Sequence, residues 1–144
     1  MNGYGPTEST TFTTSFEITP ESLEDTVPIG LPIDTRGVLI CDENLSPLPP
    51  GSKGEIIIYG QGLALGYCGD SKTTAEKFVT LPWGISAYKS GDYGHIDDTG
   101  NVYFSARCDE QLKIRGFRIS AEEIEAALRE CTDVLLSLIH ISEP

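Results

Sequence analysis

The sequence predicts an α+β protein in which short β-strands dominate, and three observations support this class. Runs of β-branched and aromatic residues are short, Pro- and Gly-rich segments separate them, and one well-marked helix start follows Ser120. Apolar residues make up 39% of the 144 residues, which suffices for a modest core. We therefore expect one domain, or two small ones, built mainly on β-sheet.

Four segments carry the composition of strands, and they are residues 10–18, 38–41, 55–59 and 101–106. Residues 97–100 precede the last of them and read Asp-Asp-Thr-Gly. Because glycine adopts a positive φ without steric cost, this tetrapeptide predicts a turn between two strands.

Two helices are expected between and after these strands. The first is short and covers residues 73–79. The second begins after Ser120, because Ser120 and Glu123 have the spacing of a capping box. Ile124 and Leu128 then share one face of that helix, so it should pack against another part of the protein.

The charge balance excludes one class of partner. The chain has 10 basic and 22 acidic residues, a net charge of −12, whereas nucleic-acid binding depends on Lys and Arg neutralising phosphates. No apolar run is long enough to span a bilayer, and residues 1–10 lack the pattern of a secretion signal. The four cysteines form no CxxC pair. We expect a cytoplasmic protein with reduced thiols and with neither nucleic-acid nor membrane partners.

Residues 2–8 combine the ingredients of a ligand site. Two glycines and a proline predict a tight loop that holds an aromatic ring, a hydroxyl and a carboxylate close together. Residues 60–67 are also rich in glycine, but their spacing matches neither GxGxxG nor the P-loop, which favours an irregular turn after a strand. Asp92 follows Gly91 and could either cap a turn or bind a ligand, whereas His95 is interpreted as structural.

Basic residues gather in one part of the chain. Four of the ten lie within twelve positions, at Arg107, Lys113, Arg115 and Arg118. They could form a cationic site for a small anion or an exposed strand that balances neighbouring acids, and the pattern leaves both open.

Four motifs occur in an order that resembles the adenylation domains of nonribosomal peptide synthetases, in the adenylate-forming, AMP-binding superfamily. They are NGYGPTE (2–8), GEIIIYGQGLALGY (54–67) with TAEKF (74–78), YKSGD (88–92) and ARCDEQLKIRGFRISAEEIE (106–125). The resemblance covers residues 2–134. It implies that residues 1–108 are the carboxy-terminal part of the large domain, with a distorted barrel-like subdomain. Residues 109–136 would be a hinge and the start of the small α+β carboxy-terminal domain, and residues 137–144 a non-native or truncated tail.

The resemblance also implies a nucleotide site. Tyr4 would stack on adenine and Asn2 would bind the base edge, while Asp92 would accept hydrogen bonds from both ribose hydroxyls. Thr7 would contact the α-phosphate, and Glu8 would hold Mg²⁺, which prefers carboxylate oxygen. Three further positions would complete the nucleotide site, namely Gly5, Phe104 and Arg107.

Beyond the nucleotide, the resemblance implies a substrate pocket and a moving domain. The amino-acid side chain would lie against Gly3, Thr11 and Phe12. Asp109 would be the hinge, and the catalytic Lys113 together with Gly116 would face the active site after domain rotation. Gly116 would then line the tunnel for the phosphopantetheine arm of a peptidyl carrier protein.

The function implied is ATP-dependent activation of an amino acid as aminoacyl-AMP, followed by transfer to the carrier thiol. An acyl- or aryl-CoA ligase is the alternative enzyme, although Pro6 and residues 113–116 favour the peptide-synthetase branch. A stand-alone acidic β-rich module without catalysis is the alternative outside enzymes. The family's phosphate loop and terminal catalytic lysine are absent from the sequence, so this polypeptide alone is expected to be inactive.

Departures from the family pattern occur inside the motifs. Leu65 stands where relatives often carry arginine, and Lys89 and Ser90 replace the commoner Arg-Thr. Ala106 replaces the usual glycine before Arg107, which adds a methyl group beside the expected nucleotide.

Overall fold

The computed structural model describes residues 1–20, 22, 26–107, 111–114, 117–120 and 127–128. The chain divides into two compact units, Met1–Cys108 and Asp109–Pro144, which we describe separately. The assignment of these parts to the large domain, hinge, small domain and tail of a family stays a prediction.

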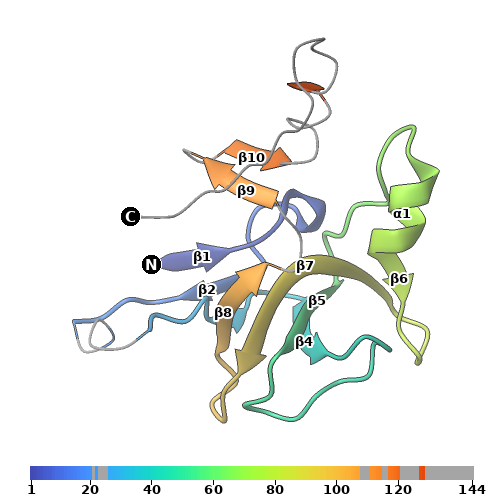
Figure 1. Cartoon of the computed structure of the whole chain (residues 1–144). Helices are drawn as coiled ribbons and strands as arrows, with labels where there is room; N and C mark the ends of the chain where they lie inside the picture. Colours follow the sequence, from blue (N-terminus) through green and yellow to red (C-terminus); the bar gives the residue numbers. More distant parts are fainter. Residues whose placement is uncertain (21, 23–25, 108–110, 115–116, 121–126, 129–144) are drawn as a thin grey trace. The chain divides into compact units, whose positions relative to one another are not determined.

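The described part of the first unit forms two antiparallel sheets (Figure 1). The smaller has the order β1-β2-β3, and the larger has the order β4-β5-β7-β6, with β8 also paired to β7. The bounds in the smaller sheet are Asn2–Tyr4 (β1), Thr14–Phe16 (β2) and Leu31–Pro32 (β3). Those in the larger are Arg36–Cys41 (β4), Gly54–Gly60 (β5), Phe78–Thr80 (β6), Ser86–Ile96 (β7) and Val102–Arg107 (β8).

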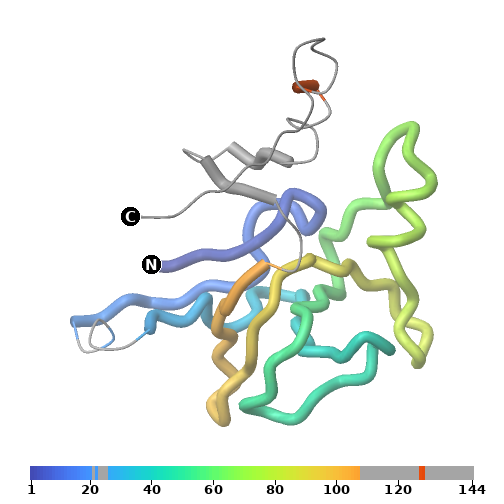
Figure 2. Tube along the Cα trace, in the orientation of Figure 1, coloured from blue at the N-terminus to red at the C-terminus, as the bar shows by residue number. Residues whose placement is uncertain are grey.

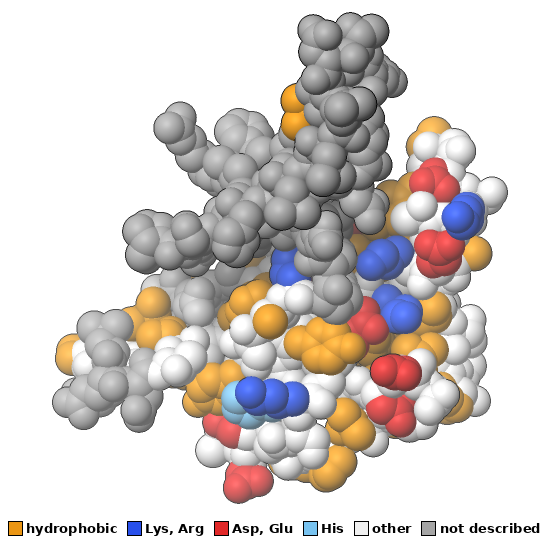
Figure 3. All heavy atoms as spheres, viewed as in Figure 1, with side chains coloured by type: hydrophobic (Ala, Val, Ile, Leu, Met, Phe, Trp, Pro, Cys, Tyr) orange, Lys and Arg blue, Asp and Glu red, His pale blue; other side chains and the backbone are white. Residues whose placement is uncertain are grey.

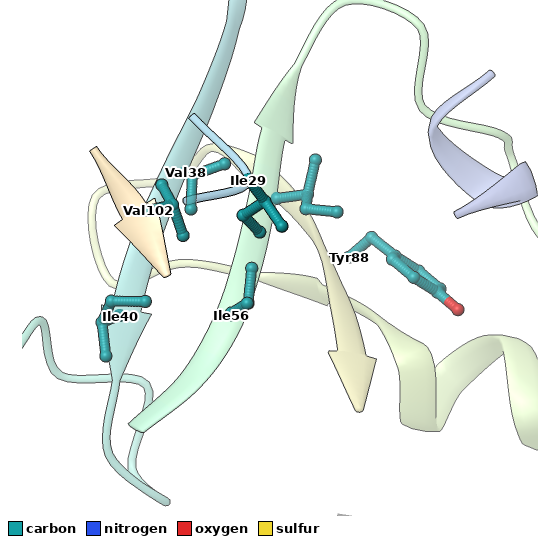
Figure 4. Close-up of a cluster of buried hydrophobic side chains, with 7 residues drawn as sticks. Ile29, Val38, Ile40, Ile56, Tyr88 and Val102 are labelled. Atoms are coloured by element: carbon teal, nitrogen blue, oxygen red, sulfur yellow. The ribbon is translucent and has the colours of Figure 1, made fainter. Parts of the chain in front are cut away.

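Strand β5 is buried on both faces. Ile56 and Ile58 belong to one apolar cluster, together with Tyr88 and other residues drawn in Figure 4. Ile57 points to the opposite face and packs with Cys41, Leu81 and Ala87. Double burial explains why this strand reads as a continuous apolar run, and each buried isoleucine contributes about 1.5–3 kcal/mol.

A short bridge joins the early part of the chain to the last strand of the larger sheet. The amide of Ile29 donates to the Val102 carbonyl at 2.8 Å, and the Val102 amide donates to the Gly30 carbonyl at 3.0 Å. Figure 2 shows this return of the blue early segment to the orange β8. Only glycine fits at position 30, because φ is +91° and an added Cβ would lie 2.0 Å from the Ser15 carbonyl oxygen.

Helix α1 (Ser71–Lys77) lies between β5 and β6 in the sequence. Its N-cap is Asp70, whose carboxylate accepts the Thr73 amide at 2.9 Å. The hydrogen bond to Thr73 lowers the pKa of Asp70. The helix therefore starts two residues before the predicted 73–79, and Phe78 already belongs to β6.

The predicted fold class is confirmed, and three of the four predicted strands occur as β4, β5 and β8. The prediction for residues 10–18 is wrong in its first half. Thr7–Ser9 forms a 3-10 turn and Thr10 has φ 68°, which interrupts an extended chain, so β2 begins only at Thr14.

The predicted turn at residues 97–100 is confirmed, and a carboxylate closes it. Asp97 Oδ1 accepts the amides of Thr99 and Asn101, each at 2.9 Å, and Gly100 has φ 89°. The side-chain hydrogen bond from Thr99 is the main reason that the pKa of Asp97 is lowered.

In the second unit, β9 (Gln111–Ile114) and β10 (Phe117–Ser120) pair as an antiparallel hairpin. Ala127 and Leu128 are helical, and the rest of the helix predicted after Ser120 lies outside the described residues. Within the described chain, no helix has the length and apolarity needed to cross a membrane. The face drawn in Figure 3 carries Lys and Arg side chains interspersed with Asp and Glu.

Candidate functional site

A bulge in the larger sheet brings Asp92 to the centre of a hydrogen-bonded cluster. Ile57 pairs with Lys89 and Glu55 pairs with Tyr93, so three residues of β7 lie opposite the single residue Ile56 of β5. Such a bulge bends the strand and redirects the side chains that it carries. Asp92 sits in it with only 4% of its surface exposed, directly opposite Arg107 of β8.

Both carboxylate oxygens of Asp92 have a strong partner. The Tyr4 hydroxyl donates to Oδ2 at 2.5 Å, and Arg107 Nη1 donates to Oδ1 at 2.6 Å. Burial of Tyr4, followed by the negative charge of Asp92, raises the pKa of this tyrosine far above its usual value. Tyr4 therefore stays a hydrogen-bond donor at physiological pH, and the cluster joins three segments distant in sequence.

Glu8 forms a second centre, on the 3-10 turn Thr7–Ser9. Its side chain is 7% exposed, and Oε1 accepts the Tyr67 hydroxyl at 2.6 Å. The oxygens of Tyr67 and the fully buried Tyr88 lie 3.2 Å apart. Burial, and then the hydrogen bond to Glu8, raise the pKa of Tyr67, so this phenol also remains protonated.

The glycine-rich segment after β5 supports the turn that carries Glu8. The Ala64 amide donates to the Glu8 carbonyl at 2.8 Å, and the Thr10 hydroxyl donates to the Gly62 carbonyl at 2.8 Å. Residues 60–67 are thus an irregular segment that packs on residues 7–10. The sequence predicted the irregular conformation but held no indication of this contact.

The first loop holds the other expected nucleotide residues in distinct surroundings. Asn2 Nδ2 donates to the Pro28 carbonyl at 2.8 Å, while the side chain of Thr7 is exposed. At Gly5, an added Cβ would lie 2.7 Å from both the Thr11 carbonyl oxygen and the Thr13 amide nitrogen, so a side chain has no room there. Phe104 is 43% exposed on β8.

Two of the three expected substrate-pocket residues lie together. A Cβ at Gly3 would come within 2.9 Å of the Phe12 ring, and that ring is 50% exposed. Thr11 is exposed as well. Lys113 belongs to β9 in the second unit, whereas Asp109 and Gly116 lie outside the described residues.

Four residues of the clusters were not among the expected site residues: Glu55, Tyr67, Tyr88 and Ser90. All four lie inside the sequence motifs, and this was the available signal. His95, expected to be structural, stacks on Tyr103 with ring centroids 4.9 Å apart. Within the described ranges, no group of three or more His, Cys, Asp or Glu side chains is arranged to hold a metal ion.

The most spacious hollow near these clusters has a volume of about 660 Å³. Its lining includes Leu65, Tyr67 and Thr74, and it is open to solvent. The Thr74 hydroxyl accepts the Tyr67 amide at 2.8 Å, which ties helix α1 to the segment after β5. The hollow therefore adjoins the residue that holds Glu8.

Comparison with known proteins identifies a family. The model of the family described as AMP-binding enzyme matches residues 1–68. A linear gramicidin synthase from Brevibacillus parabrevis is 46% identical over 133 residues, which are 89% of this chain and 2% of the relative. Tyrocidine synthase 3 from the same organism is 40% identical over 144 residues, 99% of this chain and 2% of the relative.

Solved structures agree with the sequence comparison. An NRPS protein containing adenylation and PCP domains has a TM-score of 0.86 at 39% identity, over 93% of this chain and 28% of that protein. An artificially fused adenylation-PCP di-domain from Klebsiella oxytoca has a TM-score of 0.85 at 34% identity, over 99% and 27%. The chain thus spans a small part of the proteins it matches.

Proposed function

Because the chain belongs to the AMP-binding enzyme family, with adenylation domains of nonribosomal peptide synthetases as its relatives, we propose that it supplies part of the nucleotide site of an amino-acid-activating ligase. In the first half-reaction the amino-acid carboxylate attacks the α-phosphorus of ATP and pyrophosphate leaves. In the second, a phosphopantetheine thiolate attacks the acyl carbon and AMP leaves.

The cluster around Asp92 is the observation that carries this proposal. Tyr4 and Arg107 fix both oxygens of the carboxylate, yet each oxygen has a second lone pair that can accept a further hydrogen bond. The hydroxyls on C2′ and C3′ of a ribose are adjacent donors, which suits a carboxylate held in one orientation. Asp92 would therefore bind the ribose, and Arg107 would both orient it and contact the nucleotide.

The adenine would lie beside the same cluster. The Tyr4 ring offers a stacking face whose position is fixed through its hydroxyl, and the exposed ring of Phe104 offers a second apolar surface. Asn2 would contact the base edge with its remaining donor or its acceptor oxygen, since one donor already binds the Pro28 carbonyl.

The phosphates would extend toward the turn that carries Thr7 and Glu8. The exposed Thr7 hydroxyl can donate to an α-phosphate oxygen. Glu8 fits a magnesium site, because Mg²⁺ is commonly held by one or two carboxylates together with substrate phosphates, and Tyr67 occupies only one side of Oε1. When bound, the ion would neutralise charge on the phosphates. Tyr67 would orient the carboxylate toward it.

The amino-acid side chain would contact Gly3, Thr11 and Phe12, and the pairing of Gly3 with the Phe12 ring supports this location. Asp109 would act as the hinge, and Lys113 and Gly116 would approach the site after rotation. A carrier-protein domain is the proposed acyl acceptor, since solved relatives are described as containing adenylation and PCP domains.

Titration of AMP into the 144-residue chain, followed by calorimetry, tests the nucleotide proposal. We expect saturable binding of AMP, weaker binding of GMP and CMP, and at least tenfold weaker AMP binding by Asp92→Asn, the loss that follows when a charged hydrogen-bond acceptor is removed. Equal binding of the three nucleotides, or an unchanged affinity in Asp92→Asn, would contradict the proposed site.

A further inference from the structure

The bulge that presents Asp92 is itself held in place by a side chain of the neighbouring strand. Between the pairs Ile57 with Lys89 and Glu55 with Tyr93, residues 90–92 leave the regular ladder of the sheet. Gly91 has φ 74°, a left-handed conformation that glycine adopts readily. The amides of this segment therefore need partners other than the opposing strand.

Two side chains supply those partners. Glu55 Oε1 accepts the Gly91 amide at 3.1 Å. The Ser90 hydroxyl donates to the Ile56 carbonyl at 2.6 Å and accepts the Asp92 amide at 3.0 Å. Ser90 is 2% exposed, so the loss of either contact would leave a buried polar group unsatisfied.

Glu55 also has a second contact that separates its possible roles. Lys89 Nζ lies 3.7 Å from Glu55 Oε2, whereas the Gly91 amide binds Oε1. The ion pair is partly exposed and should add little stability. The hydrogen bond to Gly91 acts one residue before the carboxylate that binds Tyr4 and Arg107.

We propose that Glu55 is a positioning residue for the nucleotide ribose: by accepting the Gly91 amide, it fixes the bulge and thereby the orientation of the Asp92 carboxylate. This inference rests on the proposed function, in which Asp92 binds the ribose hydroxyls. Glu55 acts through the backbone and touches no nucleotide. An amide oxygen at the same place preserves the effect, because only an acceptor is required.

The test compares AMP with 2′,3′-dideoxyadenosine monophosphate, which lacks both ribose hydroxyls. In Glu55→Ala we expect AMP to bind about tenfold more weakly and the dideoxy nucleotide to change by less than about twofold. Glu55→Gln should restore AMP binding to within about twofold of the wild type. Lys89→Met, which removes the ion pair and keeps the contact with Gly91, should also bind AMP like the wild type.

Three results would overturn the proposal: unchanged AMP affinity in Glu55→Ala, an equal loss for both nucleotides, or no rescue by Glu55→Gln. Amide hydrogen exchange supplies a readout independent of any nucleotide. Exchange at Gly91 and Asp92 should be faster in Glu55→Ala and return to the wild-type rate in Glu55→Gln.

The two hypotheses fail in different ways. A wild-type chain that binds both nucleotides equally would reject the ribose role of Asp92. If Gly91 exchange still responded to Glu55→Ala, Glu55 would remain the residue that fixes the bulge. Unchanged exchange at Gly91 would reject the positioning role of Glu55 whatever the nucleotides do.

Discussion

Asp92 and Glu8 are both almost fully buried carboxylates, yet their surroundings differ. Asp92 lies in a strand bulge and accepts hydrogen bonds from a phenol and a guanidinium. Glu8 lies on a 3-10 turn and accepts a hydrogen bond from Tyr67, a phenol whose oxygen lies 3.2 Å from that of Tyr88. Both are held at close hydrogen-bond distance, but by partners of different charge.

The difference matches two kinds of chemistry. The cation beside Asp92 offsets the charge of that carboxylate and leaves it suited to accept hydrogen bonds from neutral hydroxyls, as in a ribose. The phenol beside Glu8 fixes the orientation of the carboxylate without itself offsetting the charge, which suits a partner such as Mg²⁺. A buried carboxylate is thus directed to one task by the charge of the group that holds it.

Gly5→Ala should have the largest effect, because Gly5 lies between the Tyr4 of one centre and the turn of the other. The new Cβ would meet backbone atoms of Thr11, Phe12 and Thr13 at 2.7–2.8 Å. Displaced backbone cannot relax cheaply, so we expect a loss of ~3 kcal/mol or more in unfolding free energy by urea titration.

Gly51→Ala is the matched control for that substitution, since a Cβ there meets nothing within 4 Å. Its φ is +80°, so the cost should be limited to ~1 kcal/mol from the left-handed conformation. Similar losses in the two variants would show that the approach of residues 4–5 to residues 11–13 does not hold the two centres together.

Asp92→Asn should have the next largest effect. It weakens the partner of both Tyr4 and Arg107, and the expected loss of stability is ~1–3 kcal/mol, reduced from the value for a fully buried pair because Arg107 is partly exposed. Adenosine and AMP should lose affinity equally, because the affected contact is with the ribose. A loss confined to AMP would assign Asp92 to the phosphate instead.

Tyr67→Phe tests the other centre. It removes the donor to Glu8 and should cost ~1 kcal/mol of stability. Binding of ATP in the presence of Mg²⁺ should weaken severalfold, while adenosine binding should stay unchanged. If adenosine binding fell in parallel with ATP binding, the separation of the two centres would be contradicted.

Alkaline pH should have the smallest effect near neutrality and affect both centres. Tyr4 and Tyr67 have raised pKa values in the folded chain, whereas unfolded tyrosines ionise near pH 10. Above that pH the unfolded chain releases protons that the folded chain retains, so unfolding free energy should fall as pH rises from about 10. Tyr4→Phe and Tyr67→Phe should each reduce this slope in urea titrations at successive pH values.

The sequence predicted the sheet-rich class and three strands, because β-branched runs between Pro and Gly segments are local signals. It missed the long strand β7, Ser86–Ile96, since Ser90 and Gly91 interrupt the apolar pattern where the bulge lies. The strand predicted at residues 10–18 failed at Thr10, whose positive φ depends on contacts with residue 62. Propensity describes single segments, and these features depend on pairs of segments.

The candidate site divides in the same way. The motifs supplied Tyr4, Asp92 and Arg107 by family resemblance, but a motif does not reveal that their side chains bind one another across the sheet. Glu55 and Tyr67 stand within the motifs and had no assigned role, because their importance lies in the atoms they hold. Such roles emerge only from distances.

The central claim is that the ribose of an adenine nucleotide binds the Asp92 carboxylate between Tyr4 and Arg107. A crystal structure of the 144-residue chain with AMP measures this directly. The account predicts that O2′ and O3′ lie within hydrogen-bond distance of the Asp92 carboxylate, about 2.5–3.2 Å, with the adenine against the Tyr4 ring. AMP bound with its ribose away from Asp92, or bound at another site, would contradict it.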